Sequence, residues 1–202
     1  FKVAEALVDA GLPPGVVTVI TGPSSKLAAE LIAAAAIRKV SLTGSVAVGK
    51  KVLAQCAEGI KRASMELGGH APVIVHRDAD PKTSAKAAAI AKFRNTGQVC
   101  ISPTRFYVHE SIKAPFEEAF VDYARSIVVG DGLRDGVTMG PMIRGSAVDG
   151  ALELIQDAVA KGGRLLHGGR RPASLNKGHF LEPTVIADVP DDARIMVEEP
   201  FA

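Results

Sequence analysis

The sequence predicts an α/β fold with parallel sheets. Short strand-like runs alternate with helical patterns, and glycine, serine or threonine opens most of the turns between them. Strands that are joined through helices lie parallel, and such crossovers are almost always right-handed. The pattern stops at Gly68-Gly69 and then starts again. We therefore expect parts of two domains, residues 1–67 and residues 68–202.

The first domain opens with an amphipathic helix at residues 1–10. Gly11 suits the left-handed position after its last turn, and Leu12–Gly15 has turn chemistry. Val16–Ile20 is continuously apolar and largely β-branched, which is typical of a strand buried on both faces. The remaining elements are expected as an alanine-rich helix at residues 26–36, a strand at 38–42, a helix at 46–58 and a strand at 61–67.

The second domain repeats this alternation. Ala71–Val75 reads as a strand, and Asp80-Pro81 opens a helix, because aspartate favours the N-cap and proline the first helical position. The later elements are expected as a helix at residues 83–94, a strand at 105–109, helices at 112–128 and 146–161, and a strand at 164–166. From Gly178 onward the sequence reads as extended loop.

Composition limits the possible functions. Of the 202 residues, 47% are hydrophobic and 23% are charged, which allows a packed core. The net charge is +2 with both signs interspersed, so the chain lacks the basic stripe that nucleic acid or an anionic membrane requires. No apolar run reaches the length of a membrane span. We expect a soluble, cytoplasmic protein that binds small molecules.

The cysteines and histidines give no pattern for a disulfide framework or a metal centre. Cys56 and Cys100 lack CxxC spacing, which favours a reducing compartment. The five histidines are not spaced as ligands with one another or with an acid. A Cys-His hydrolase has no local signature here, although its histidine need not be close in sequence.

Both ends of the chain are abrupt. A helical pattern is already under way at Phe1, without an N-cap or initiator methionine before it. Val197–Ala202 stops without a capping or tail signal. We expect the chain to be an internal fragment of a longer protein.

The turn from Gly44 to Lys50 has two interpretations. Four residues separate Gly44 from Gly49 before Lys50, as in a P-loop, but Lys51 occupies the position of the serine or threonine that holds magnesium. A nucleotide triphosphatase is therefore disfavoured. The turn is either a helix N-terminus that offers N–H groups to a phosphate or an ordinary tight turn.

A cysteine and a glutamate form the candidate catalytic pair. Cys100 follows the Gly97-Gln98 turn, and Glu66 lies upstream on a predicted strand. A thiolate can attack a carbonyl carbon, and a carboxylate can activate the water that breaks the covalent adduct. Without further context, a small buried core residue is the better explanation for Cys100, and a surface residue at a strand end for Glu66.

Five motifs, in this order, resemble the aldehyde dehydrogenase superfamily. They are Val40–Ser45, Met65–Gly69, Asn95–Cys100, Gly178–Thr184 and Glu198–Phe201. Each motif alone is weak, but together they extend over essentially the whole chain. The resemblance implies parts of two Rossmann-like parallel-sheet domains. Residues 1–67 correspond to the C-terminal part of the NAD(P)-binding domain, and residues 68–202 to most of the catalytic, thiol-bearing domain.

The resemblance also assigns roles to the candidate residues. Cys100 corresponds to the nucleophile that forms a thiohemiacetal and then a thioester, with its own backbone N–H as half of an oxyanion hole. Glu66 corresponds to the base that activates the hydrolytic water. The cofactor is NAD or NADP, and the residues that correspond to its contacts are Gly44, Ser45, Leu67, Glu199 and Phe201.

Within the superfamily, Lys92–Asn95 and Val19–Gly22 followed by Ser25 resemble the succinate-semialdehyde dehydrogenase branch. There, the arginine at the position of Arg94 helps to bind the distal carboxylate of the substrate, and a guanidinium fork suits a carboxylate. The alternative for Arg94 is a helix-end arginine that caps carbonyls or pairs with an acid. The resemblance implies a short semialdehyde acid, such as succinic semialdehyde, as the substrate.

Some features depart from that branch. Ser102 replaces the second cysteine with which some members form a redox switch, so we expect no switch. Thr21–Ser25 differs from the Gly-x-Gly-Pro turn that lies beside the adenine in many members of the superfamily. We therefore assign no adenine contacts to this turn. The resemblance places the oxyanion asparagine and the coenzyme-selecting residues upstream of Phe1, and the oligomerisation strand downstream of Ala202. We expect this segment alone to be inactive and the complete protein to be a homodimer or homotetramer.

Two other functions stay open at this point. An acylating member of the superfamily passes the thioester to coenzyme A, but such members usually lack the base glutamate, so Glu66 argues against this alternative. The other is a non-catalytic binding or structural use of the same fold, because a fold alone does not define a function.

Overall fold

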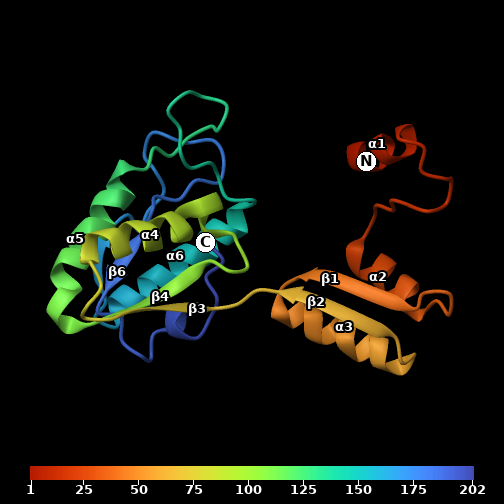
Figure 1. The fold of residues 1–202 in the computed structure, drawn as a ribbon, viewed down its shortest axis with the longest axis horizontal. Helices are drawn as coiled ribbons and strands as arrows, with labels where there is room; N and C mark the ends of the chain where they lie inside the picture. The colour runs from red at the N-terminus through yellow and green to blue at the C-terminus, as the bar shows by residue number, and fades with distance from the viewer. The chain divides into compact units, whose positions relative to one another are not determined.

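The computed structural model describes residues 1–202, which divide into two compact units, Phe1–Leu67 and Gly68–Ala202. Both units combine helices with strands, so the α/β prediction is confirmed (Figure 1). Each of the three sheets has two strands, and two of the sheets are parallel. None of the helices combines the length and the apolar character that a membrane crossing requires.

The first unit contains the parallel pair β1 (Lys39–Gly44) and β2 (Arg62–Leu67). The helix α3 (Val46–Glu58) connects them, as a parallel crossover requires. The register sets Thr43 opposite Glu66 and Gly44 opposite Leu67. The sequence predicted these three elements to within two residues at each end.

The core of the first unit is small. The helix α2 (Ser24–Ala33) lies against α3, and their buried side chains pack on half-buried residues of the strands. The buried members are Ile32, Val52 and Cys56, and the half-buried members on the strands are Val40, Leu42 and Met65. Cys56 is 2% exposed and serves as a small core residue.

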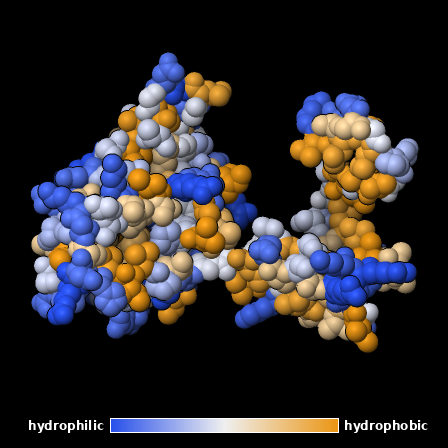
Figure 2. All heavy atoms as spheres, viewed as in Figure 1, coloured by the Kyte–Doolittle hydropathy of each residue, from blue (hydrophilic) through white to orange (hydrophobic).

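The strand predicted at Val16–Ile20 is wrong. These residues have no regular secondary structure and connect α1 (Lys2–Asp9) to α2. Their apolar side chains are exposed, as the orange spheres of this part of the chain illustrate in Figure 2. A strand needs a neighbour for its backbone hydrogen bonds, and β1 and β2 pair only with each other. Composition alone therefore does not produce a strand here.

The second unit is built on the parallel pair β3 (Ala71–Val75) and β4 (Pro103–Val108). The helix α4 (Pro81–Phe93) follows β3. Asp80 caps it, because its Oδ1 accepts a hydrogen bond from the amide of Thr83 at 2.8 Å. The predicted helix start at Asp80-Pro81 is therefore confirmed.

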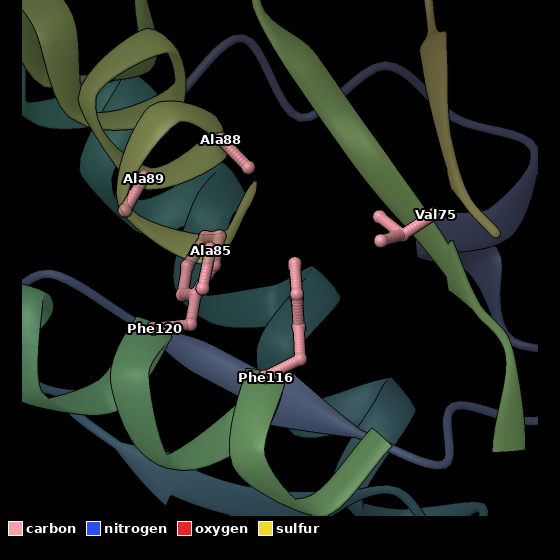
Figure 3. Packing of buried hydrophobic residues seen from close by; sticks show 6 residues of the cluster. All are labelled: Val75, Ala85, Ala88, Ala89, Phe116 and Phe120. Carbon is pink, nitrogen blue, oxygen red and sulfur yellow. The ribbon is translucent and has the colours of Figure 1, made fainter. Parts of the chain in front are cut away.

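Alanines on α4 and aromatic residues on α5 (Glu110–Ser126) form the core of this unit (Figure 3). Because Ala85 and Ala89 are small, α5 approaches closely, and both are fully buried. The ring of Phe120 lies 5.0 Å from that of Phe106 and 5.8 Å from that of Phe93, measured between centroids. Burial of one such ring contributes about 1.5–3 kcal/mol. This packing fixes the end of α4, from which the chain continues to Cys100.

Five further elements complete the second unit. A short 3₁₀ turn, η1 (Arg94–Gly97), follows α4, and later come α6 (Gly145–Ala160), β5 (Arg164–His167), β6 (Val185–Ala187) and η2 (Arg194–Met196). Strand β6 pairs antiparallel with β5, which corrects the loop expected beyond Gly178. A three-residue strand is too short to show a period of two in sequence.

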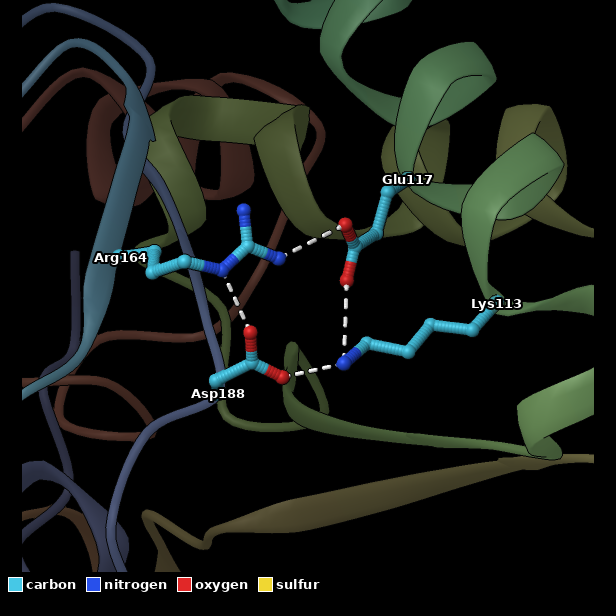
Figure 4. Close-up of polar contacts among 4 residues, drawn as sticks. All are labelled: Lys113, Glu117, Arg164 and Asp188. Atoms are coloured by element: carbon cyan, nitrogen blue, oxygen red, sulfur yellow. Dashed lines mark hydrogen bonds and ion pairs between the residues drawn. The ribbon is translucent and has the colours of Figure 1, made fainter.

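Ion pairs connect α5 to the β5–β6 pair (Figure 4). Asp188 binds both Lys113 and Arg164, and Glu117 completes the ring at 3.2 Å from Arg164 and 3.7 Å from Lys113. The four side chains keep between 23% and 52% of their surface exposed. Solvent therefore screens each pair, and each contributes little by itself.

Candidate active site

Cys100 lies in an exposed turn after η1. Exposure argues against the interpretation of Cys100 as a buried core residue, the role that Cys56 has instead. The backbone just before it is left-handed, with φ of +51° at Asn95, +54° at Thr96 and +73° at Gly97. A β-branched residue such as Thr96 seldom adopts this conformation, which costs about 1–3 kcal/mol. Strain of this kind persists only where the surrounding contacts enforce it.

Gln98 supplies those contacts. Its Nε2 donates a hydrogen bond to Thr96 Oγ1, and its Oε1 accepts one from the amide of Ile143 at 3.1 Å. Asn95 Nδ2 in turn donates to the Gln98 carbonyl at 3.0 Å. Gln98 thus holds the cysteine loop in shape and connects it to the loop before α6. From the sequence, Gln98 is predicted only to be a turn residue. Its role in the loop could not be predicted, because its partner Ile143 is distant in the sequence.

Glu66 lies on β2 in the first unit, opposite Thr43, with its side chain exposed. Cys100 belongs to the second unit. The cooperation of Glu66 with Cys100 therefore stays a prediction.

Gly44 and Ser45 lie where β1 ends and α3 begins. Ser45 is the N-cap, and its Oγ accepts a hydrogen bond from the amide of Val48 at 3.3 Å. Both residues are exposed at the carboxyl end of a parallel strand, where α/β proteins bind their ligands. The free N–H groups of the first turn fit a phosphate group, which favours this interpretation over an ordinary turn.

Leu67 ends β2 and packs under α3. A Cβ built on Gly49 would lie 2.7 Å from Leu67 Cδ1, so a larger residue at this position would require the leucine side chain to shift. Leu67 is half-buried by this contact. Its role toward a cofactor stays a prediction.

Glu199 and Phe201 belong to a segment that passes close to three glycines. Glu199 Oε1 accepts a hydrogen bond from the amide of Gly69 at 3.0 Å, and a Cβ on Gly68 would lie 2.2 Å from Glu199 Oε2. A Cβ on Gly97 would lie 2.1 Å from the carbonyl oxygen of Ala202. The segment from Glu199 to Ala202 therefore lies against both the Gly68-Gly69 motif and the cysteine loop, which brings three of the sequence motifs together.

Arg94 is exposed at the start of η1 and forms no ion pair. It lines a small hollow with Tyr123 and Thr138. This position does not support the alternative in which Arg94 pairs with an acid. Binding of a substrate carboxylate by Arg94 stays a prediction.

A cavity within the second unit is lined by Thr96 of the cysteine loop and by Ala202, among other residues. It has a volume of about 690 Å³ and is lined mainly by apolar residues, among them Phe106, Phe116 and Met139. Cys100 does not line it. No cluster of three side chains of the metal-binding types occurs in the chain.

Comparison with known proteins identifies the family. The family whose sequence pattern matches residues 1–202 is described as the aldehyde dehydrogenase family. The chain belongs to the aldehyde dehydrogenase family. The match extends over both units, in agreement with the five motifs.

Relatives within the aldehyde dehydrogenase family are about two-fifths identical to this chain over the aligned residues. Glutarate-semialdehyde dehydrogenase from Pseudomonas putida is 42% identical over 202 residues, which cover 98% of this chain and 41% of the relative. Succinate-semialdehyde dehydrogenase (NADP(+)) from Escherichia coli is 41% identical over 201 residues, which cover 100% of this chain and 41% of the relative. The chain thus spans 41% of the length of these curated relatives.

A solved structure shows the same arrangement of elements. An aldehyde dehydrogenase C mutant from Pseudomonas syringae, solved in complex with NAD+ and octanal, matches with a TM-score of 0.94 at 33% identity. The match covers 98% of this chain and 41% of that chain. The aldehyde dehydrogenase fold predicted from the motifs is confirmed.

Proposed function

We propose that the complete protein oxidises a short semialdehyde acid, such as succinic semialdehyde, to the corresponding dicarboxylate with NAD or NADP. The observation that carries this proposal is the contact between the exposed, strained cysteine loop and the segment from Glu199 to Ala202. A nucleophile and the acid expected to bind the cofactor thereby lie on neighbouring loops of one unit. Family membership supports the reaction class.

In the proposed reaction, the Cys100 thiolate attacks the aldehyde carbon, and a C–S bond forms while the carbonyl oxygen becomes an oxyanion. The backbone N–H of Cys100 donates a hydrogen bond to that oxyanion. When bound, NAD or NADP supplies the acceptor for the hydride that leaves the carbon, and a thioester remains on Cys100.

Glu66 completes the proposed cycle as a general base. It takes a proton from a water molecule, whose oxygen attacks the thioester carbon. The C–S bond breaks, the carboxylic acid leaves, and the thiolate of Cys100 is restored. An aldehyde, a water molecule and an oxidised cofactor thus give a carboxylic acid, a proton and a reduced cofactor.

The residues available for the cofactor fit its chemical groups. Gly44 and Ser45 offer N–H donors at the start of α3, which suit a pyrophosphate. Glu199 offers a carboxylate that can accept hydrogen bonds from ribose hydroxyls, and Phe201, two residues further on, is an aromatic residue that is 44% exposed. Leu67 is proposed as a further cofactor contact at the end of β2.

Arg94 supports a substrate with a distal carboxylate. The guanidinium is exposed, free of acid partners and close in sequence to Cys100. Its planar fork matches a carboxylate through two parallel hydrogen bonds. The names of the two relatives reported above also describe aldehydes that carry a carboxylate.

Steady-state kinetics with the protein in its natural length tests the proposal. Succinic semialdehyde, glutaric semialdehyde and neutral aldehydes of similar length are each supplied with NAD or NADP, with and without coenzyme A. The proposal predicts reduction of one of the two dinucleotides without coenzyme A, and loss of that reduction in Cys100→Ala. Strict dependence on coenzyme A would instead support an acylating enzyme, and full activity of Cys100→Ala would contradict the mechanism.

A further inference from the structure

The segment that carries Glu199 is held by side chains that have no role in the reaction described above. His70 Nε2 lies 2.8 Å from the carbonyl oxygen of Ile195. Arg105 Nη1 donates a hydrogen bond to the carbonyl of Met196 at 3.4 Å, and its Nη2 donates to the carbonyl of His70 at 2.6 Å. The backbone around η2 is thus bound to the start of β3 and to β4.

The partners of His70 define its tautomer. A carbonyl oxygen only accepts hydrogen bonds, so the proton must be on Nε2. Nδ1 contacts Thr104 Oγ1, and in the neutral ring it accepts the hydroxyl proton of Thr104. Burial lowers the pKa of His70, and the charges of Arg105 and Lys92 act in the same direction, against the Ile195 hydrogen bond and Glu199. Both ring nitrogens are therefore satisfied in the neutral form.

His70 and Gly69 are adjacent, and each binds a different point of the same segment. The ring of His70 binds the Ile195 carbonyl, and the amide of Gly69 binds the Glu199 carboxylate at 3.0 Å. Beyond these points, Lys92 Nζ donates to the Ala202 carbonyl at 2.6 Å. The carboxylate is thus fixed by its own hydrogen bond and by the carbonyl that His70 holds upstream.

We propose that His70 is a positioning residue that orients the Glu199 carboxylate for the cofactor. This inference rests on the proposed function, because it assumes that Glu199 binds NAD or NADP. A carboxylate that is already ordered binds its ligand without a further loss of side-chain freedom. Loss of the Ile195 hydrogen bond is therefore expected to weaken dinucleotide binding without changing the chemistry at Cys100.

Two substitutions separate the functions of the two ring nitrogens. The amide nitrogen of glutamine can reach the position of Nε2, so His70→Gln is expected to keep the Ile195 hydrogen bond. The shorter asparagine reaches only the position of Nδ1, so His70→Asn is expected to keep the Thr104 contact and to lose the Ile195 hydrogen bond. The two variants have the same polar group and differ only in its reach.

Hydrogen exchange measures how often the hydrogen bonds of the segment open, and it needs neither cofactor nor substrate. The amides of Val197 and Glu198 both donate to the carbonyl of Arg194, so they report opening of η2. In His70→Asn these amides are expected to exchange about tenfold faster than in the wild type, and His70→Gln is expected to restore most of the protection. The amide of Ser84, which is bonded within α4 to Asp80, serves as the unchanged reference.

Titration calorimetry and kinetics then measure the effect on the cofactor in the protein of natural length. His70→Asn is expected to raise the Kd for the preferred dinucleotide about tenfold, to leave kcat within about twofold, and to be rescued by His70→Gln. Equal exchange rates at Val197 and Glu198 in all three proteins would overturn the proposal, as would equal losses of affinity in both variants. If the wild type binds neither NAD nor NADP, the proposed function fails, whereas the exchange rates still decide whether His70 holds the segment.

Discussion

The two cysteines of the chain differ in their exposure to solvent. Cys56 is buried in the first unit, whereas Cys100 is presented at the surface by a left-handed turn that Gln98 stabilises. A thiol needs access to its substrate before any other property matters. The motif Asn95–Cys100 indicated this residue from the sequence, but the contacts that shape the loop could not be predicted, because Ile143 is distant in the chain.

At the scale of single residues, the proposed carboxylate-binding role of Arg94 can be tested by substitution. Replacing Arg94 with leucine removes the guanidinium fork and keeps an apolar stem of similar bulk. We expect the KM for succinic semialdehyde to rise at least about tenfold, because a charge-assisted bidentate contact contributes about 1.5–3 kcal/mol. The KM for a neutral aldehyde of similar length should stay within about twofold, and equal increases for both substrates would remove the carboxylate-binding role.

Lys92 gives a second prediction at this scale. Burial lowers the pKa of Lys92 from 10.5 to about 8. Between these two pH values the unfolded chain binds more protons at this position than the folded chain, so the contribution of Lys92 to stability rises with pH. The free energy of unfolding of the wild type, minus that of Lys92→Met, is therefore expected to increase from pH 7 to pH 10 in urea titrations.

Lys86 provides the matched control for this experiment. It lies on the same helix α4, but its side chain is exposed. Lys86→Met should show no comparable change with pH. If the two variants share one pH dependence, burial does not perturb Lys92 as described.

At the scale of elements, helix starts could be predicted from the sequence, whereas some strands could not. Asp80 is an N-cap that the sequence identifies, and the helix predicted at residues 46–58 begins directly after Ser45, so both helices begin where expected. Val16–Ile20 and Val185–Ala187 were misread, because a strand depends on a partner that lies outside its own residues. Local signals predict helices, whereas pairing decides strands.

Substitution of Gly68 by alanine tests whether the close approach of the Glu199 segment matters for cofactor binding. In Gly68→Ala the new Cβ would occupy the place of the Glu199 carboxylate, which lies 2.2 Å away, so the side chain must move. We expect dinucleotide affinity to fall at least about tenfold, with little change in the unfolding midpoint, because only the end of a flexible side chain is displaced. Calorimetric titration and thermal unfolding measure the two quantities.

Gly150 is the matched control for Gly68. It lies within α6, and a Cβ built on it meets nothing within 4 Å. Gly150→Ala is expected to leave dinucleotide affinity unchanged and to stabilise the fold by about 0.5–1 kcal/mol, because alanine loses less backbone freedom than glycine in a helix. If both substitutions weaken binding alike, the approach at Gly68 is not the cause.

The ion-pair ring between α5 and the β5–β6 pair gives a pH-dependent prediction. The hydrogen bond from Lys113, with that from Arg164, holds the pKa of Asp188 below its usual value. A carboxylate with a lowered pKa stabilises the fold above its unfolded pKa, and this contribution is lost as the pH falls through the folded pKa. Asp188→Asn should therefore destabilise the protein at pH 7 by no more than about 1 kcal/mol and have no effect near pH 2.

Denaturant titrations at both pH values check this prediction. Asparagine is a suitable replacement, because Asp188 has a φ of +52° and asparagine tolerates the left-handed region as aspartate does. Equal destabilisation at both pH values would show that the effect comes from the backbone and not from the charge.

At the scale of the whole molecule, the candidate residues are divided between two units. Gly44, Ser45 and Glu66 belong to Phe1–Leu67, whereas Cys100 and Glu199 belong to Gly68–Ala202. The α/β class and the family could be predicted, because five motifs occur in order along the sequence and family membership is now established. The role of His70 could not, because its hydrogen bond joins residues 125 positions apart.

Trapping of the acyl intermediate tests the central claim most directly. In the protein of natural length, Glu66→Gln is mixed with succinic semialdehyde and the preferred dinucleotide, and peptides are analysed by mass spectrometry. We expect one burst of dinucleotide reduction, an acyl group on the peptide that contains Cys100, and steady turnover at least about 100-fold below that of the wild type. Turnover at the wild-type rate, or an acyl group on another residue, would contradict the assignment of Cys100 as nucleophile and Glu66 as base.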